Sequence, residues 1–119
     1  MSQAERRKEL DTLRRNLSIK SNEFKDYCMA VPPLERAYQE AKATESLKLR
    51  ASGENVGMID KTIRGRKGVS DLRFDRDLAI AQREACKMAI KSIESSINAL
   101  QTAIKSEDKE HEMAGRFET

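Results

Sequence analysis

The sequence predicts an all-α protein: an antiparallel helical hairpin or coiled coil with a kinked or broken first arm. Charged residues make up 36% of the 119 residues and aromatic residues 4%, with two prolines and five glycines, a composition that favours long helices over strands. Two stripes of apolar residues repeat in steps of three and four, as on the buried face of a helix, and a segment with four glycines separates them. The whole chain, 1–119, is expected to form one helical domain.

The first helix is expected over 2–31. Ser2 stands three residues before Glu5, which is the spacing of a capping box. Two or more narrow apolar stripes must pack together, because a long amphipathic helix is not stable alone. The stripe of this helix consists of Leu10, Leu13, Leu17, Phe24, Tyr27 and Val31.

A proline pair interrupts the first arm. Pro32 and Pro33 remove two amide donors and disfavour helix at the preceding residue, so we expect a break or a sharp kink there. Proline also suits the first turn of a new helix. A second helical segment is therefore predicted over 33–50.

The second arm follows a basic, glycine-containing loop predicted over 51–69, with a short helical turn around 58–63. Ser70 is a good N-cap, so a long helix is expected over 70–106. A polar tail that frays is expected over 107–119. The stripe of the long helix is Ile90, Ile93, Ile97, Leu100 and Ile104.

The two stripes allow a register to be written for the hairpin. Antiparallel pairing of residues whose numbers sum to about 114 brings every strong apolar position of one stripe to the other. The flanks of the seam carry further apolar residues, so a homodimer of hairpins that closes into a four-helix bundle is expected ahead of a monomer. The register predicts the pairs Leu10–Ile104, Leu13–Leu100, Leu17–Ile97, Phe24–Ile90 and Cys28–Cys86.

Positive charge is concentrated at the predicted turn. Residues 48–76 hold eight basic and four acidic residues, an excess larger than the whole-chain net charge of +3. Cations beside glycines can follow a phosphate backbone, and the absence of aromatic residues over 39–73 does not support base stacking in the loop. A solvated loop and an acidic protein partner remain open alternatives. The predicted nucleic-acid-binding residues are Lys61, Arg64, Arg66, Lys67 and Arg73.

Other chemistry is poorly represented. His111, the single histidine, is a weak basis for a metal site, and no catalytic constellation assembles around it. Cys28 and Cys86 are expected to pack as small apolar side chains, with a redox clasp between the helices as the alternative. We therefore expect no cofactor, no metal and no enzymatic activity. No apolar run is long enough for a membrane span, and the first residues lack a signal peptide, which predicts a cytoplasmic protein.

Four features together resemble small phage-encoded helical-hairpin proteins: a charged N-terminal helix, the stretch LERAYQEAKATESLKLRASG, a variable loop, and a helix reading LRFDRDLAIAQREACKMAIKSIESSINALQTAIKS. Such proteins are found among replication and recombination genes. The resemblance covers roughly residues 10–106, with most of the likeness in SIESSINALQTAIKS. It implies an accessory role in phage DNA metabolism or host takeover, in the host cytoplasm. The alternative hypothesis is a protein-binding module or inhibitor that docks a helical face onto a host or phage enzyme.

Overall fold

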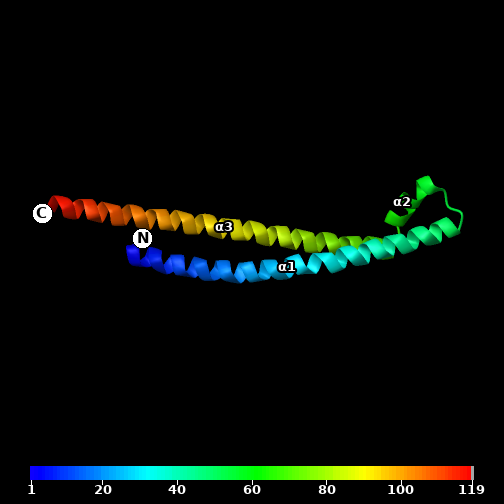
Figure 1. The fold of residues 1–119 in the computed structure, drawn as a ribbon, viewed down its shortest axis with the longest axis horizontal. Coiled ribbons are helices and arrows are strands. Elements are labelled where there is room, and N and C mark those ends of the chain that lie inside the picture. The colour runs from blue at the N-terminus through cyan, green and yellow to red at the C-terminus, as the bar shows by residue number, and fades with distance from the viewer. Residues whose placement is uncertain (119) are drawn as a thin grey trace. The chain divides into compact units, whose positions relative to one another are not determined.

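The structure is a computed structural model that describes residues 1–118, with side chains up to residue 116. Its elements are three helices: α1 (Gln3–Ala51), α2 (Val56–Arg64) and α3 (Lys67–Glu118). Helix α1 packs antiparallel against α3, which confirms the predicted all-α helical hairpin (Figure 1). The chain divides into two compact units, and Met1–Glu23 with Cys86–Thr119 form unit 1 while Phe24–Ala85 forms unit 2.

Unit 1 is held by the predicted heptad seam. Its buried residues are Leu10, Ile97 and Ile104, each less than a tenth exposed. Leu10 and Ile104 therefore share one cluster, as the register predicts, and the half-buried residues around this cluster include both members of the pair Leu13–Leu100. Leu17 and Ile93 complete the cluster. The predicted pairs Phe24–Ile90 and Cys28–Cys86 combine residues of different units and stay predictions.

The beginning of α1 has the predicted capping box. Ser2 Oγ accepts a hydrogen bond from the Glu5 amide at 3.1 Å, and Glu5 Oε2 accepts one from the Ser2 amide at 3.4 Å. Gln3 Nε2 then donates across unit 1 to the carbonyl of Ile104 at 3.4 Å. The two capping bonds satisfy amide groups that a helix leaves unpaired at its start, and the Gln3 side chain connects the first turn of α1 to α3.

The proline pair does not break α1. The expectation of separate helices over 2–31 and 33–50 is wrong, since α1 is helical from Gln3 to Ala51 with both prolines inside it. Two adjacent prolines leave the carbonyls four residues before them, at Cys28 and Met29, without helical partners. Pro32, Pro33 and Met29 are exposed, so water can reach this side of the helix. Packing of α1 on either side of the prolines then outweighs the local cost.

Unit 2 replaces most of the predicted 51–69 loop with helix. Helix α2 occupies 56–64 because Ile59 and Ile63, one turn apart, are both buried, at 4% and 2% exposure. They form a core cluster with Leu49 of α1 and Val69 of α3, against which Tyr38 and Ala41 pack. The sequence-based prediction recognised only a helical turn here, since a nine-residue helix surrounded by glycines depends on these contacts.

Glycine and asparagine define the short connection before α2. Gly53 has a φ of 81°, and the amides of Gly53 and Glu54 donate to the carbonyls of Arg50 and Leu49 at 3.1 and 3.0 Å, a Schellman ending for α1. Asn55 then caps α2, and its side chain accepts from the Gly57 amide at 3.0 Å. The chain is thus reversed within four residues, 52–55.

Helix α3 is longer than predicted at both ends. It begins at Lys67 instead of residue 70, and the Ser70 amide donates to the Arg66 carbonyl at 2.9 Å, so Ser70 lies inside the helix and is not its cap. It continues to Glu118, so the predicted polar tail over 107–119 is helical as far as the structure describes it, and Thr119 lies outside the described residues. Good helix formers and contacts from α1 to Glu107 and Asp108 account for the extension.

Candidate nucleic-acid interface

The five predicted nucleic-acid-binding residues all lie in unit 2. Lys61 and Arg64 are in the last turn of α2, Arg66 is in the link to α3, Lys67 begins α3, and Arg73 lies further along α3. The first four are exposed and Arg73 is half-buried. These five residues, Lys61, Arg64, Arg66, Lys67 and Arg73, are called the cationic surface below.

Most of the cationic surface has no acidic partner among the described residues. Within that part of the chain only Arg66, of the five, approaches a carboxylate, with 3.9 Å between Arg66 Nε and Glu45 Oε2. Glu45 is shared, because Lys48 Nζ lies 3.6 Å from its other oxygen. The remaining four cations form no ion pair with any residue that the structure describes. Unpaired cations keep their hydration and their counterions, which is the state from which phosphate binding gains free energy.

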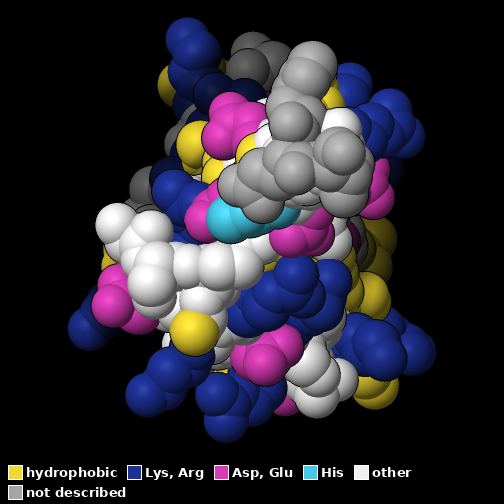
Figure 2. Space-filling model, turned by 90° about the vertical axis from the view of Figure 1, so that its left-hand side faces the viewer, with side chains coloured by type: hydrophobic (Ala, Val, Ile, Leu, Met, Phe, Trp, Pro, Cys, Tyr) yellow, Lys and Arg dark blue, Asp and Glu magenta, His cyan; other side chains and the backbone are white. Residues whose placement is uncertain are grey.

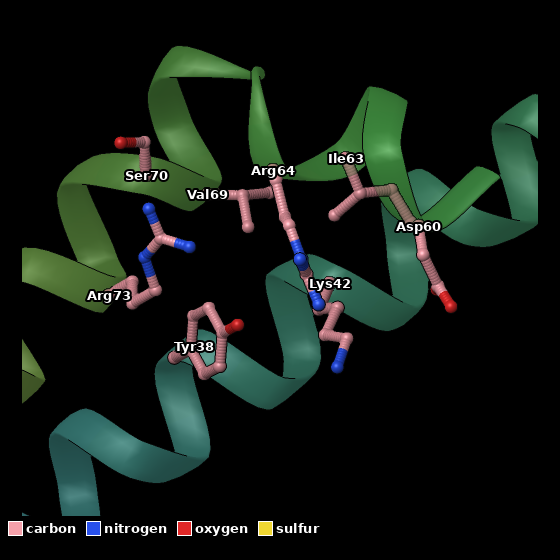
Figure 3. A pocket seen from close by; sticks show the side chains of 8 residues that line it. All are labelled: Tyr38, Lys42, Asp60, Ile63, Arg64, Val69, Ser70 and Arg73. Atoms are coloured by element: carbon pink, nitrogen blue, oxygen red, sulfur yellow. The ribbon is translucent and has the colours of Figure 1, made fainter. Parts of the chain in front are cut away.

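A pocket of about 110 Å³ lies within unit 2, where all three helices contribute side chains. Arg64 and Arg73 belong to both this pocket and the cationic surface. Figure 3 shows Arg64 extending from α2 toward Lys42 of α1, and Arg73 of α3 extending on the side of Ser70. The residues that line the pocket are Tyr38, Lys42, Asp60, Ile63, Arg64, Val69, Ser70 and Arg73.

Sequence reasoning missed Lys42 and Tyr38, which α1 contributes to this pocket. A usable signal was present, because the register sum of about 114 sets Lys42 opposite Leu72, next to Arg73, and Tyr38 opposite Arg76. The structure bears out the second pairing, since the guanidinium of Arg76 lies 4.4 Å from the centre of the Tyr38 ring. Lys42 Nζ lies 5.9 Å from the same centre.

Arg76 differs from Arg73, one turn before it, because its charge is fully engaged. Its guanidinium donates to Glu35 Oε2 at 3.1 Å and to Asp77 Oδ1 at 2.9 Å. The hydrogen bond to Asp77, followed by that to Glu35, raises the pKa of Arg76. Hydrogen bonds from Gln39 and then from Arg76 lower the pKa of Glu35 below its ordinary value of 4.5, against desolvation, which raises it. Glu35 and Asp77 are thus both hydrogen-bonded to Arg76, and neither of them pairs with Arg73.

The basic residues at the beginning of α1, in unit 1, differ from the cationic surface because they have acidic partners. Arg6 forms an ion pair with Glu107, and Arg7 Nη2 lies 3.5 Å from Asp108 Oδ2. Figure 2 shows this end of unit 1, where Lys and Arg side chains (blue) are interleaved with Asp and Glu side chains (magenta). Such interleaving lowers the local potential and leaves little excess charge for an anion.

His111 and the two cysteines do not form a metal or catalytic site within the described residues. His111, visible in cyan in Figure 2, lies 3.8 Å from Glu107, and the described residues contain no group of three potential metal ligands. Cys28 and Cys86 are free thiols, and buried Cys86 donates to the carbonyl of Lys20 at 3.5 Å, as a packed side chain does. Whether the two thiols form a redox clasp stays a prediction.

Comparison with known protein families, with curated proteins and with solved structures finds no match to this chain. None of the described helices combines the length and apolar character that a membrane crossing needs.

Proposed function

We propose that this protein is a non-enzymatic accessory protein that binds nucleic acid, or a nucleoprotein complex, through its cationic surface. The observation that carries the proposal is the absence of acidic partners for Lys61, Arg64, Lys67 and Arg73 within the described residues. Each Lys or Arg that neutralises a phosphate releases a condensed counterion, and this release supplies most of non-specific affinity. Binding of this kind falls steeply with salt and has little sequence preference.

The proposal is tested by fluorescence anisotropy titration of single- and double-stranded oligonucleotides at low salt. The variant Arg64→Gln/Lys67→Gln removes two exposed, unpaired cations of the cationic surface. We expect it to weaken binding about tenfold or more, because two phosphate contacts are lost. The matched control is Lys8→Gln/Arg14→Gln, which removes one lysine and one arginine from exposed positions in unit 1.

The control variant is expected to bind within about twofold of the unchanged protein, after allowance for its lower net charge. Absence of binding to any DNA or RNA probe at low salt would reject the proposal. Equal weakening by both double variants would show that total charge, and not the cationic surface, determines affinity.

The cellular setting belongs to the same proposal. The resemblance of residues 10–106, and of SIESSINALQTAIKS most of all, to phage-encoded hairpin proteins supports a role in phage replication or recombination, in the host cytoplasm. Nucleic-acid binding fits such a role. The genomic neighbourhood tests this role: the gene should lie in a phage genome, beside replication or recombination genes.

We also propose that the protein forms a homodimer in which a second copy of the chain packs on the outer face of α3 in unit 2. Phe74, Leu78, Ala81 and Ala85 follow steps of four, three and four, which is the spacing of a coiled-coil seam. All four are exposed, Phe74 at 66% and Leu78 at 46%. Light scattering should give a dimer that Phe74→Ser/Leu78→Ser converts to a monomer.

The same face favours protein docking as the second candidate function. Docking onto a host or phage enzyme would be supported by two results together. Light scattering would give a monomer, and a pull-down from a host lysate would retain one protein in stoichiometric amount after nuclease treatment. Loss of that partner in Phe74→Ser/Leu78→Ser would place it on α3. A nuclease-sensitive association would instead support the nucleic-acid function.

A further inference from the structure

We propose that the pocket lined by Tyr38, Lys42, Asp60, Arg64, Ser70 and Arg73, called the three-helix pocket below, binds a phosphomonoester. Its source would be the phosphorylated end of a nucleic-acid strand, an assignment that rests on the proposed function. The pocket lies within unit 2 and differs from the rest of the cationic surface in being concave and lined from three helices.

The charge of the three-helix pocket suits a dianion. Three cations line it, Lys42 from α1, Arg64 from α2 and Arg73 from α3, and Asp60 is its one carboxylate. None of the three cations forms an ion pair with a residue that the structure describes. The excess of two positive charges matches a phosphomonoester, which carries about −1.5 to −2 at neutral pH, better than a phosphodiester with a single charge.

The neighbouring acids do not neutralise this excess. Glu35 and Asp77 are both hydrogen-bonded to Arg76, which takes up their charge one turn away from Arg73. Asp60 lies on α2 one turn before Arg64, and Figure 3 shows its carboxylate directed away from Arg73. An anion between Arg64 and Arg73 would therefore meet donors before it meets a carboxylate.

The size of the three-helix pocket limits what can enter it. At about 110 Å³ it falls below the roughly 300 Å³ at which pockets for drug-sized ligands begin, so a phosphoryl group fits and a whole nucleotide does not. Stacking of a base on Tyr38 is disfavoured, because Arg76 already lies 4.4 Å from the ring centre. Tyr38 and Ser70, which carry hydroxyl groups, also line the pocket. The recognised feature is therefore the phosphoryl group and not the base.

The test compares one single-stranded oligonucleotide with a 5′-phosphate and with a 5′-hydroxyl end, in anisotropy titrations against the full chain. We expect the 5′-phosphate strand to bind about tenfold more tightly, since charge-assisted hydrogen bonds are the strong ones. In Arg73→Gln this preference should fall to about twofold or less. Arg64→Gln, a change at an exposed residue, is the second variant in case Arg73→Gln perturbs folding.

The matched control is Lys67→Gln, which belongs to the cationic surface but does not line the three-helix pocket. It should weaken both strands equally and keep the preference for the 5′-phosphate. A separate arm titrates inorganic phosphate alone, followed by amide chemical shifts of Val69 and Ser70. This arm separates a free phosphate from a strand end as the source of the ligand.

Equal binding of the two strands by the unchanged protein would overturn the pocket proposal while leaving nucleic-acid binding intact. If neither strand binds, phosphate-induced shifts that vanish in Arg73→Gln would keep the phosphomonoester site and reject the nucleic-acid function. No strand binding together with no phosphate-induced shift would reject both. A preference that survives both Arg73→Gln and Arg64→Gln would also overturn the assignment.

Discussion

Units 1 and 2 contain similar arginines in opposite electrostatic states. In unit 1, Arg6 and Arg7 face carboxylates of α3, Glu107 and Asp108, across the hairpin. In unit 2, Arg64 and Arg73 line a pocket and have no carboxylate partner in the described structure. Charge counts along the sequence do not reveal this difference, because it depends on what the opposite helix presents. Excess charge therefore becomes a candidate site only where the fold leaves it unpaired.

The largest effect should come from the core that positions α2. Ile63→Ala removes the most buried side chain of unit 2 and should lower the free energy of unfolding by about 2–5 kcal/mol in urea denaturation. Amide exchange over 56–64 should accelerate as α2 detaches. Met58→Ala, on the same helix at 46% exposure, is the control and should cost much less. Equal losses in the two variants would show that α2 is not anchored as described.

The next effect concerns the cap of α2. Asn55→Ala removes the side-chain acceptor for the Gly57 amide and should cost about 1 kcal/mol of stability. Asn16→Ala, at an exposed position within α1 of unit 1, should be neutral or slightly stabilising because alanine is the better helix former. Urea denaturation of both variants decides this, and a loss in Asn16→Ala equal to that in Asn55→Ala would refute the cap.

The ion pairs of unit 1 should contribute less. A double-mutant cycle with Arg6→Gln and Glu107→Gln should give a coupling of about 0.2–1 kcal/mol, because both side chains remain partly exposed. Glu107→Gln also leaves Arg6 unpaired, and nucleic-acid affinity should then rise slightly. A coupling near zero would mean that the pairing of Arg6 with Glu107 does not form in solution.

The smallest effect is a pH dependence in unit 2. Folding lowers the pKa of Glu35 below its ordinary value of 4.5. The contribution of ionised Glu35 to the free energy of unfolding is therefore complete above pH 4.5 and is lost as the pH falls below that value. The free energy of unfolding should therefore fall less between neutral and acidic pH in Glu35→Gln than in the unchanged protein. Gln39→Ala removes the largest cause of the shift and should act in the same direction. Parallel pH curves for all three proteins would contradict this.

The fold was predictable where one strong pattern governs it. The isoleucines of α3 and the leucines of α1 are bulky, regularly spaced and buried together, so the register near Leu10 and Ile104 follows from spacing alone. The proline pair and α2 were mispredicted because local propensity competes there with packing that sequence spacing does not show. Pro32 lies in a continuous helix, and Ile63 finds Leu49 and Val69 only after the chain has turned.

The candidate site was half predictable. The five cations were identified from charge density, and all five lie in unit 2. The concave part of the site was not, because Lys42 lies in a stretch of α1 with nearly balanced charge and reaches the pocket only through the hairpin. The separate states of Arg73 and Arg76 could not be predicted either, since they depend on which carboxylates lie within hydrogen-bond distance of each guanidinium.

The most direct measurement is the salt dependence of oligonucleotide binding for the two matched double variants. If Arg64 and Lys67 each neutralise one phosphate, Arg64→Gln/Lys67→Gln should flatten the slope of log affinity against log salt by about 1.4 for a single strand. Lys8→Gln/Arg14→Gln should keep the slope of the unchanged protein. An unchanged slope in the first variant, or equal flattening in both, would contradict the claim that unpaired cations of unit 2 form the interface.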